Sequence, residues 1–288
     1  MLALSVCLAL LAALGNAAAS VLQRHGAAGA ALPAASVRGW WPRLVRRRDW
    51  VWGAAFLGVS GVFQALALAT GPLAVVQPVM STELLFTLVL GGVVFRRRPD
   101  TRTWWAFGAM AVGLGAFLAL AEPSGGRASV PASDWVWTGA AVGSVAVVLV
   151  VLSLRLRAAP RAALLGTATA LGFSCTAALL KDALGRLPEG VGALLTAWPL
   201  YAAILVGLAS FALLQVTFRA GSLVASQPAL TLGDALLSVV LGVVLFHEHV
   251  ELGGRVPFEA LALAVLVAGC ARLARSPLVV GEEGEQSW

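Results

Sequence analysis

The chain has 288 residues, of which 59% are apolar and 12% charged, and its net charge at pH 7 is +6. Ordinary soluble domains carry roughly 25% charged residues, and a soluble core of this size would not bury so much apolar surface. Because a bilayer solvates apolar helix faces directly, the composition predicts an all-α integral membrane protein. The basic residues occur in short runs between apolar segments, a pattern that indicates membrane topology and argues against nucleic acid as a partner.

Windows of about 20 apolar residues predict nine transmembrane helices. In chain order they cover 2–22, 50–70, 73–95, 103–121, 135–153, 162–183, 196–218, 222–246 and 256–274. Arg24 follows the first apolar segment and no basic residue precedes it, so this segment is predicted to be a span and not a signal peptide. The region 26–45, which contains Pro33 and Pro42, is predicted to be a loop, and a tenth span there is the alternative.

The positions of the basic residues predict the orientation. With the N-terminus outside, four of the 20 Lys and Arg residues fall in outer loops, and all the others fall inside. Those four are Arg127, Lys181, Arg186 and Arg255. The chain is therefore predicted to be a multi-pass protein of the cell inner (plasma) membrane, with the N-terminus outside and the C-terminus in the cytoplasm.

An internal repeat orders the nine spans. Residues 71–79 read GPLAVVQPV and residues 221–229 read GSLVASQPA, so Gly, Leu, Gln and Pro align without a gap. Spans one to four then correspond to spans six to nine, and corresponding spans point in opposite directions because they are five apart. This predicts two inverted-topology repeats, at 1–122 and 158–275, joined by an outer loop and linker span at 123–157. Residues 276–288 are predicted to be a disordered cytoplasmic tail.

The order of spans, the QALALATGPL run at 64–73 and the Gln-Pro span starts resemble the drug/metabolite transporter (DMT) superfamily, in its EamA-like bacterial branch. The resemblance covers about residues 1–275. The nine-span layout is similar to that of the NIPA-type magnesium transporter relatives, so the resemblance implies a small-molecule or Mg²⁺ carrier. Relatives commonly have ten spans, and an acidic turn often follows the fourth helix. Here Arg96–Arg98 stand at that turn in the first half, and only Phe246-His247-Glu248 keep something like it.

Two carboxylates lie well inside predicted spans. Glu83 and Asp234 occupy nearly corresponding positions of the two repeats, offset by one after the Gln-Pro pair. A charged carboxylate at the centre of a span costs about 2.5–3.5 kcal/mol, so each is expected to face a wet cavity, a cation or a partner. We interpret the pair as binding a cation or exchanging protons. The alternative is that each carboxylate is neutral or hydrogen-bonded and only helps the helices to pack.

Glutamine and proline form a second set of candidates. Pro78 and Pro228 are predicted to break their helices and to free backbone carbonyls, and Gln77 and Gln227 precede them. Gln64 and Gln215 lie deeper in the second and seventh spans. All four amides are candidates for substrate contact, whereas buried amides also serve simply to tie helices together.

Other polar residues are assigned to surfaces. Lys181 and Asp182 end the sixth span and are predicted to reach out to the membrane surface. His247, Glu248, His249 and Glu251 lack the i, i+4 spacing of a helical zinc site and are predicted to form a solvated outer loop. Gly139 and Gly143 predict a close-packing face inside the fold, with a homodimer contact as the alternative.

The sequence therefore predicts a secondary transporter that moves a small solute or cation by alternating access, with proton coupling as an option. An Mg²⁺ transporter of the NIPA-like type and a non-transporting scaffold or sensor remain alternatives. No ATP-binding motif and no nucleophile–base arrangement is recognisable, so neither an enzyme nor a cofactor is expected. The expected partners are the lipid bilayer and the substrate.

Overall fold

The structure is a computed structural model that describes residues 2–28, 48–94, 101–121, 126–156, 158–220, 223–248, 261–262, 264–265 and 268. Every regular element in these residues is helical. They are α1 (Leu2–Ala28), α3 (Arg48–Thr70), α4 (Leu73–Met80), α5 (Glu83–Val94), α6 (Thr101–Ala121), α7 (Ala132–Ser153), α8 (Ala158–Leu184), a 3₁₀ turn (Leu187–Glu189), α9 (Val191–Thr196), α10 (Trp198–Ala220) and α11 (Leu223–Phe246). The first eight predicted spans fall on these helices. Most of the ninth, nearly all of the predicted loop 26–45 and the whole predicted tail 276–288 lie outside the described residues.

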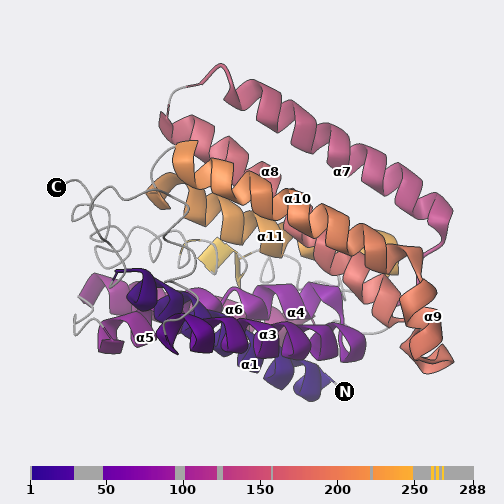
Figure 1. Ribbon diagram of the computed structural model, residues 1–288, viewed down its shortest axis with the longest axis horizontal. Helices are drawn as coiled ribbons and strands as arrows, with labels where there is room; N and C mark the ends of the chain where they lie inside the picture. The colour runs from indigo at the N-terminus through magenta and orange to yellow at the C-terminus, as the bar shows by residue number, and fades with distance from the viewer. Residues whose placement is uncertain are drawn as a thin grey trace.

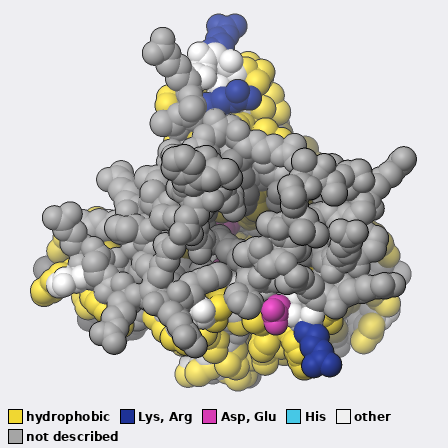
Figure 2. Space-filling model, turned by 60° about the vertical axis from the view of Figure 1, so that its left-hand side comes forward, with side chains coloured by type: hydrophobic (Ala, Val, Ile, Leu, Met, Phe, Trp, Pro, Cys, Tyr) yellow, Lys and Arg dark blue, Asp and Glu magenta, His cyan; other side chains and the backbone are white. Residues whose placement is uncertain are grey.

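The helices match the dimensions of a bilayer. Within the described residues, seven helical segments are long and apolar enough to cross a membrane, and one of them combines α4 and α5. The helix α6 adds an apolar stretch at Trp104–Phe117. Large apolar side chains such as Val147, Leu205 and Leu208 are exposed, as expected for surfaces that face lipid. Figure 2 shows mainly hydrophobic side chains among the described residues at the rim of one face. The protein is a multi-pass helical membrane protein.

The helices form two groups. In Figure 1, α1 and α3 to α6 lie together in the lower part of the view, and α7, α8, α10 and α11 lie above them. Within the groups, α1 packs mainly on α3, and α8 packs on both α10 and α11. The main contact between the groups joins α4 to α11, and all eight residues of α4 are buried. The helix α7 is peripheral, because it packs almost entirely on α8.

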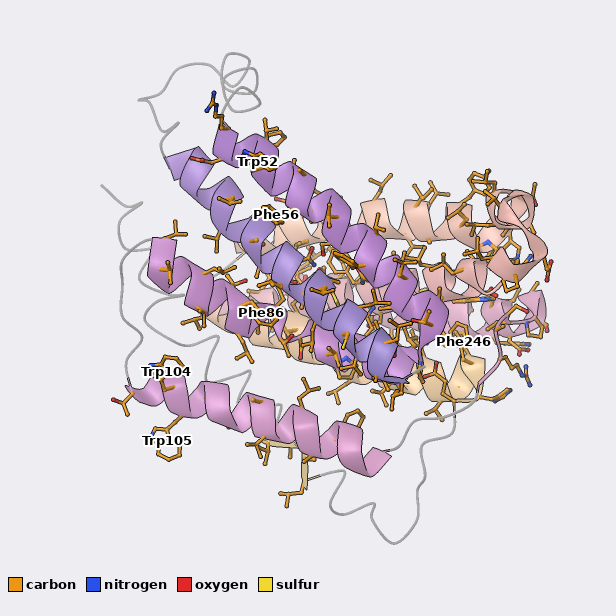
Figure 3. All side chains as sticks on the ribbon, turned by 90° about the horizontal axis from the view of Figure 1, so that it is seen from below. Trp52, Phe56, Phe86, Trp104, Trp105 and Phe246 are labelled. Atoms are coloured by element: carbon orange, nitrogen blue, oxygen red, sulfur yellow. The ribbon has the colours of Figure 1, made fainter. Side chains whose placement is uncertain are left out.

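Aromatic side chains mark one end of the bundle. Trp52 near the start of α3 and Trp104 and Trp105 near the start of α6 lie at the same end, whereas Phe246 lies at the opposite end (Figure 3). Trp52 is 61% exposed and Trp105 is 75% exposed. Exposed tryptophans at helix starts are typical of a membrane–water interface. The two helices therefore start on the same side of the bilayer.

The third apolar segment is divided into two helices. Pro72, in extended conformation (φ −64°, ψ 142°), separates α3 from α4, and Pro78 lies inside α4. Since proline has no N–H to donate, the helix tightens after it. The Ser81 hydroxyl donates to the Pro78 carbonyl at 2.6 Å, and the Thr82 hydroxyl donates to the Val79 carbonyl at 2.7 Å. These bonds satisfy the carbonyls where α4 gives way to α5.

The same close contact occurs in both groups. Gly15 of α1 lies against Ser60 of α3, where an added Cβ would be 3.0 Å from the serine Cβ. Gly172 of α8 lies against Ser210 of α10, and an added Cβ would again be 3.0 Å from the serine Cβ. Small residues allow helix backbones to approach closely in membranes. By contrast, Gly139 has nothing within 4 Å of such a Cβ and is exposed, so the internal close packing predicted for it is wrong.

Alanine at these glycines is expected to have opposite effects. Gly172→Ala should lower the free energy of unfolding by about 1–3 kcal/mol, because the new methyl group overpacks the contact with Ser210. Gly139→Ala should be neutral or stabilising by up to about 1 kcal/mol, since alanine is the better helix residue. Thermal unfolding in detergent compares the two. Equal melting temperatures would mean that α8 and α10 do not approach closely at Gly172.

Candidate polar sites in the helix bundle

The first candidate carboxylate is held by an amide. Glu83 is the first residue of α5 and is half-buried. The side-chain N–H of Asn16 in α1 donates to Glu83 Oε2 at 3.2 Å. The hydroxyl of Ser60 in α3 lies 2.8 Å from Asn16 Oδ1 and 2.7 Å from the Ala12 carbonyl, and can donate to either. Three helices are thus joined through one polar chain that ends on the carboxylate.

The second candidate carboxylate is held by a hydroxyl. Asp234 lies in α11 and is half-buried, whereas Ser174 of the adjacent helix α8 is fully buried. The Ser174 oxygen lies 2.8 Å from Asp234 Oδ1, 3.1 Å from the Asp234 carbonyl and 2.9 Å from the Ala170 carbonyl. A hydroxyl has one proton, so it donates well to only one of these three acceptors at a time.

The two carboxylates occupy equivalent positions of the two predicted repeat copies. Residues 82–94 (TELLFTLVLGGVV) align without a gap on 233–245 (GDALLSVVLGVVL), which pairs Glu83 with Asp234. The spacing from the Gln-Pro pair to the carboxylate is one residue shorter in the first copy. One residue turns a helix by about 100°, and the division between α4 and α5 falls within this shorter stretch. In the second copy the whole stretch lies inside the continuous helix α11.

The predicted glutamine candidates do not share one environment. Gln77 is buried within α4, and Gln64 is half-buried in α3. Gln215 is exposed on α10. Gln227 and Pro228 belong to α11, but their side chains lie outside the described part of the structure. Among the three glutamine side chains that the structure describes, Gln77 is therefore the most buried.

A third polar cluster, at the end of the bundle where α4 begins, was not predicted. Glu248, which is 2% exposed, accepts hydrogen bonds from the first backbone N–H groups of α4: Leu73 N to Oε1 at 2.7 Å and Ala74 N to Oε2 at 2.9 Å. A carboxylate at a helix start is favoured by the helix dipole and by these otherwise unpaired donors. The predicted solvated loop is wrong for Glu248, although the neighbouring His247 is exposed.

Lys181 completes this cluster. Its Nζ lies 3.0 Å from Glu248 Oε1, donates to the Gly71 carbonyl at 2.7 Å and stands 5.2 Å from the ring centroid of Phe246. The lysine side chain is 12% exposed, so the predicted position at the membrane surface is wrong. Residues of α8 and of the segment after α11 therefore hydrogen-bond to the backbone where α3 ends and α4 begins. We call Glu248, Lys181 and the Gly71–Ala74 backbone the α4 clamp.

Asp182 is also turned inward. It is fully buried, and it accepts hydrogen bonds from Val130 N at 2.9 Å and from the indole N–H of Trp135 at 2.8 Å. The Trp135 ring meets Trp198 edge-on, with centroids 6.1 Å apart. Arg127 and Val130 lie in the segment that precedes α7. The backbone N–H of Arg127 donates to the Phe246 carbonyl at 2.6 Å, so a second hydrogen bond holds this segment. The prediction that Asp182 reaches the surface is therefore wrong.

The chain was also compared with known proteins. No family model matches it, and no solved structure matches it. It is similar to an uncharacterized protein of Corynebacterium glutamicum, with 29% identity over 239 residues that cover 79% of each chain. The similarity extends over most of both chains.

Proposed function

We propose that the protein is a secondary carrier of the inner (plasma) membrane, which moves a small polar solute or a cation by alternating access. Its two inverted four-span halves are α1 with α3 to α6, and α8, α10 and α11 with the predicted span 256–274. The helix α7 links them. The N-terminus lies outside and the C-terminus in the cytoplasm, as the loop charges indicate.

The observation that carries this proposal is the duplicated arrangement of carboxylate and partner. In each half, a carboxylate of the third span bonds to a polar side chain of the first: Asn16 to Glu83, and Ser174 to Asp234. The glycine–serine contacts between the first and second spans are duplicated as well. Corresponding spans are five apart and so run in opposite directions, an arrangement found in many secondary transporters.

The substrate route follows the contact between the halves. The fully buried helix α4 packs on α11 there, and it carries Gln77 and Pro78. Irregular backbone at membrane depth is tolerated where it lines a cavity or lies buried in protein, and the divided α4–α5 segment is such a place. Glu83 and Asp234 are the groups that bind a cation or a polar solute from either half, with Gln64 and Gln77 as amide contacts.

The proposal is tested by uptake into liposomes. A thermal-shift screen of the purified protein against amino acids, nucleosides, sugars, amines and Mg²⁺ selects the solute. Uptake of that solute is then measured for the parent and for Glu83→Gln and Asp234→Asn. Each substitution removes a charged ligand, so the initial rate should fall about tenfold to a hundredfold.

The matched control is Asp134→Asn, which removes an exposed carboxylate at the start of α7. Its only described ion pair, with Arg127, is 3.5 Å long and solvated, so uptake should equal that of the parent. Mg²⁺ uptake would identify the magnesium carrier. If no solute moves and both variants match the parent in cells, the scaffold or sensor alternative replaces the carrier.

A further inference from the structure

The second carboxylate site contains a buried hydroxyl that lacks a hydrogen-bond partner. Ser238 lies in α11 one turn after Asp234 and is fully buried, and its Oγ bonds to no other atom of the described structure. Buried polar groups are nearly always paired, because an unpaired one costs about 1–3 kcal/mol. The exception therefore calls for an explanation at this position.

The carbonyl that would normally accept from Ser238 lies next to a second serine. Serines in membrane helices usually donate to the carbonyl four residues earlier, as Ser174 and Ser210 do here. For Ser238 that carbonyl belongs to Asp234, and the Ser174 hydroxyl already lies 3.1 Å from it. Ser238 follows Asp234 by one helical turn, so the two residues share a face of α11.

We propose that Asp234, Ser174 and Ser238 form a binding site for one small alkali cation, Na⁺, which drives the carrier. All three groups offer hard oxygen ligands. One carboxylate balances one positive charge. Ser174 keeps its donor bond to the Ala170 carbonyl while a lone pair of its oxygen faces the ion. The inference rests on the proposed function, because it names the ion coupled at the same carboxylate.

The packing favours a small ion without its water. A Cβ added to Gly233 would lie 2.8 Å from the Ala170 Cβ, so α8 and α11 are in close contact beside the site. Mg²⁺ loses its water reluctantly and usually keeps several molecules, and K⁺ is larger than Na⁺.

The equivalent carboxylate in the first half already accepts a hydrogen bond from a protein amide. There the side-chain N–H of Asn16 donates to Glu83, and the Ser60 hydroxyl lies within hydrogen-bond distance of the Asn16 amide oxygen. Thr87 stands at the position that corresponds to Ser238. The asymmetry assigns the ion to the second half alone, and Thr87 provides a matched control.

The test is a titration of the purified protein with NaCl, at constant ionic strength maintained with choline chloride, read as melting temperature. Na⁺ should raise the melting temperature of the parent in a saturable manner, with a smaller effect from KCl. Asp234→Asn should abolish the shift. Ser238→Ala should need about tenfold more Na⁺, since one neutral ligand is lost, while Thr87→Val should behave as the parent.

A second measurement separates ligand loss from loss of structure. Without Na⁺, Ser238→Ala should be at least as stable as the parent, because it removes an unpaired buried hydroxyl. Equal Na⁺ shifts in all variants, or a shift that depends on pH and not on Na⁺, would overturn the cation site. Solute uptake that ignores a Na⁺ gradient would overturn the coupling and leave the carrier intact. Specific Na⁺ binding without uptake of any solute would support the site and count against the carrier.

Discussion

Replacing Glu248 by alanine is expected to lower the free energy of unfolding by about 3–5 kcal/mol. The substitution would leave Lys181 partly buried without its carboxylate, and it would remove the acceptor of two backbone N–H groups at the start of α4. Breaking a buried pair by removing one partner is costly, because the remaining charge and donors stay in the protein interior. Reversible unfolding in mixed micelles, followed by circular dichroism, measures the change.

Two further variants identify the cause. Glu189→Ala removes an exposed carboxylate from the 3₁₀ turn and should change stability by less than about 0.5 kcal/mol. Glu248→Gln keeps the shape, but its NH₂ group would face a backbone donor or Lys181, so its stability should lie between those of the parent and the alanine variant. A Glu248→Ala protein as stable as Glu189→Ala would show that the α4 clamp contributes little.

Replacing Asp182 by alanine should have the second large effect. Val130 N and the Trp135 indole N–H would both lose their buried acceptor, at about 1–3 kcal/mol for each donor. Trp135→Phe removes one of these donors by itself. The double variant should therefore be less destabilised than the sum of the two single variants, as expected for groups in contact. Thermal unfolding of the four proteins gives the coupling energy.

The control for this cycle is Asp134→Ala, one residue before Trp135. Asp134 is solvated and pairs only weakly with Arg127 in the described structure, so its removal should leave the melting temperature nearly unchanged. Strict additivity of the Asp182 and Trp135 variants would contradict the direct hydrogen bond. A large effect of Asp134→Ala would mean that any change at the start of α7 lowers stability, and that the hydrogen bonds of Asp182 are not the specific cause.

The helices could be predicted from the sequence because a membrane span is a local property. Twenty apolar residues in a row satisfy their own backbone in any context, so windows such as 50–70 and 135–153 fall on α3 and α7. The division of 73–94 into α4 and α5 was anticipated only as a break near Pro78. After Met80 the backbone N–H and the hydroxyl of Ser81 both donate to the Pro78 carbonyl, and those of Thr82 both donate to the Val79 carbonyl.

The polar clusters could not be predicted in the same way. Lys181, Asp182 and Glu248 stand at the ends of apolar segments, where charged residues usually face water, and a local rule assigns them there. Their actual partners lie 110, 52 and 175 positions away in the chain. One signal was present: Gly71-Pro72 begins a new helix whose first N–H groups require an acceptor. The sequence does not say which carboxylate supplies it.

The α4 clamp has a consequence for the order in which the chain is made. Leu73 and Ala74 leave the ribosome long before Glu248, which follows them by about 175 residues. Until then the start of α4 has no carboxylate, and its first N–H groups lack their protein acceptor. The N-terminal helices therefore enter the membrane as an unfinished structure, which is completed only when α11 has been synthesised. A ribosome stalled between α8 and α11 would hold a nascent protein in which the start of α4 still lacks the Glu248 carboxylate.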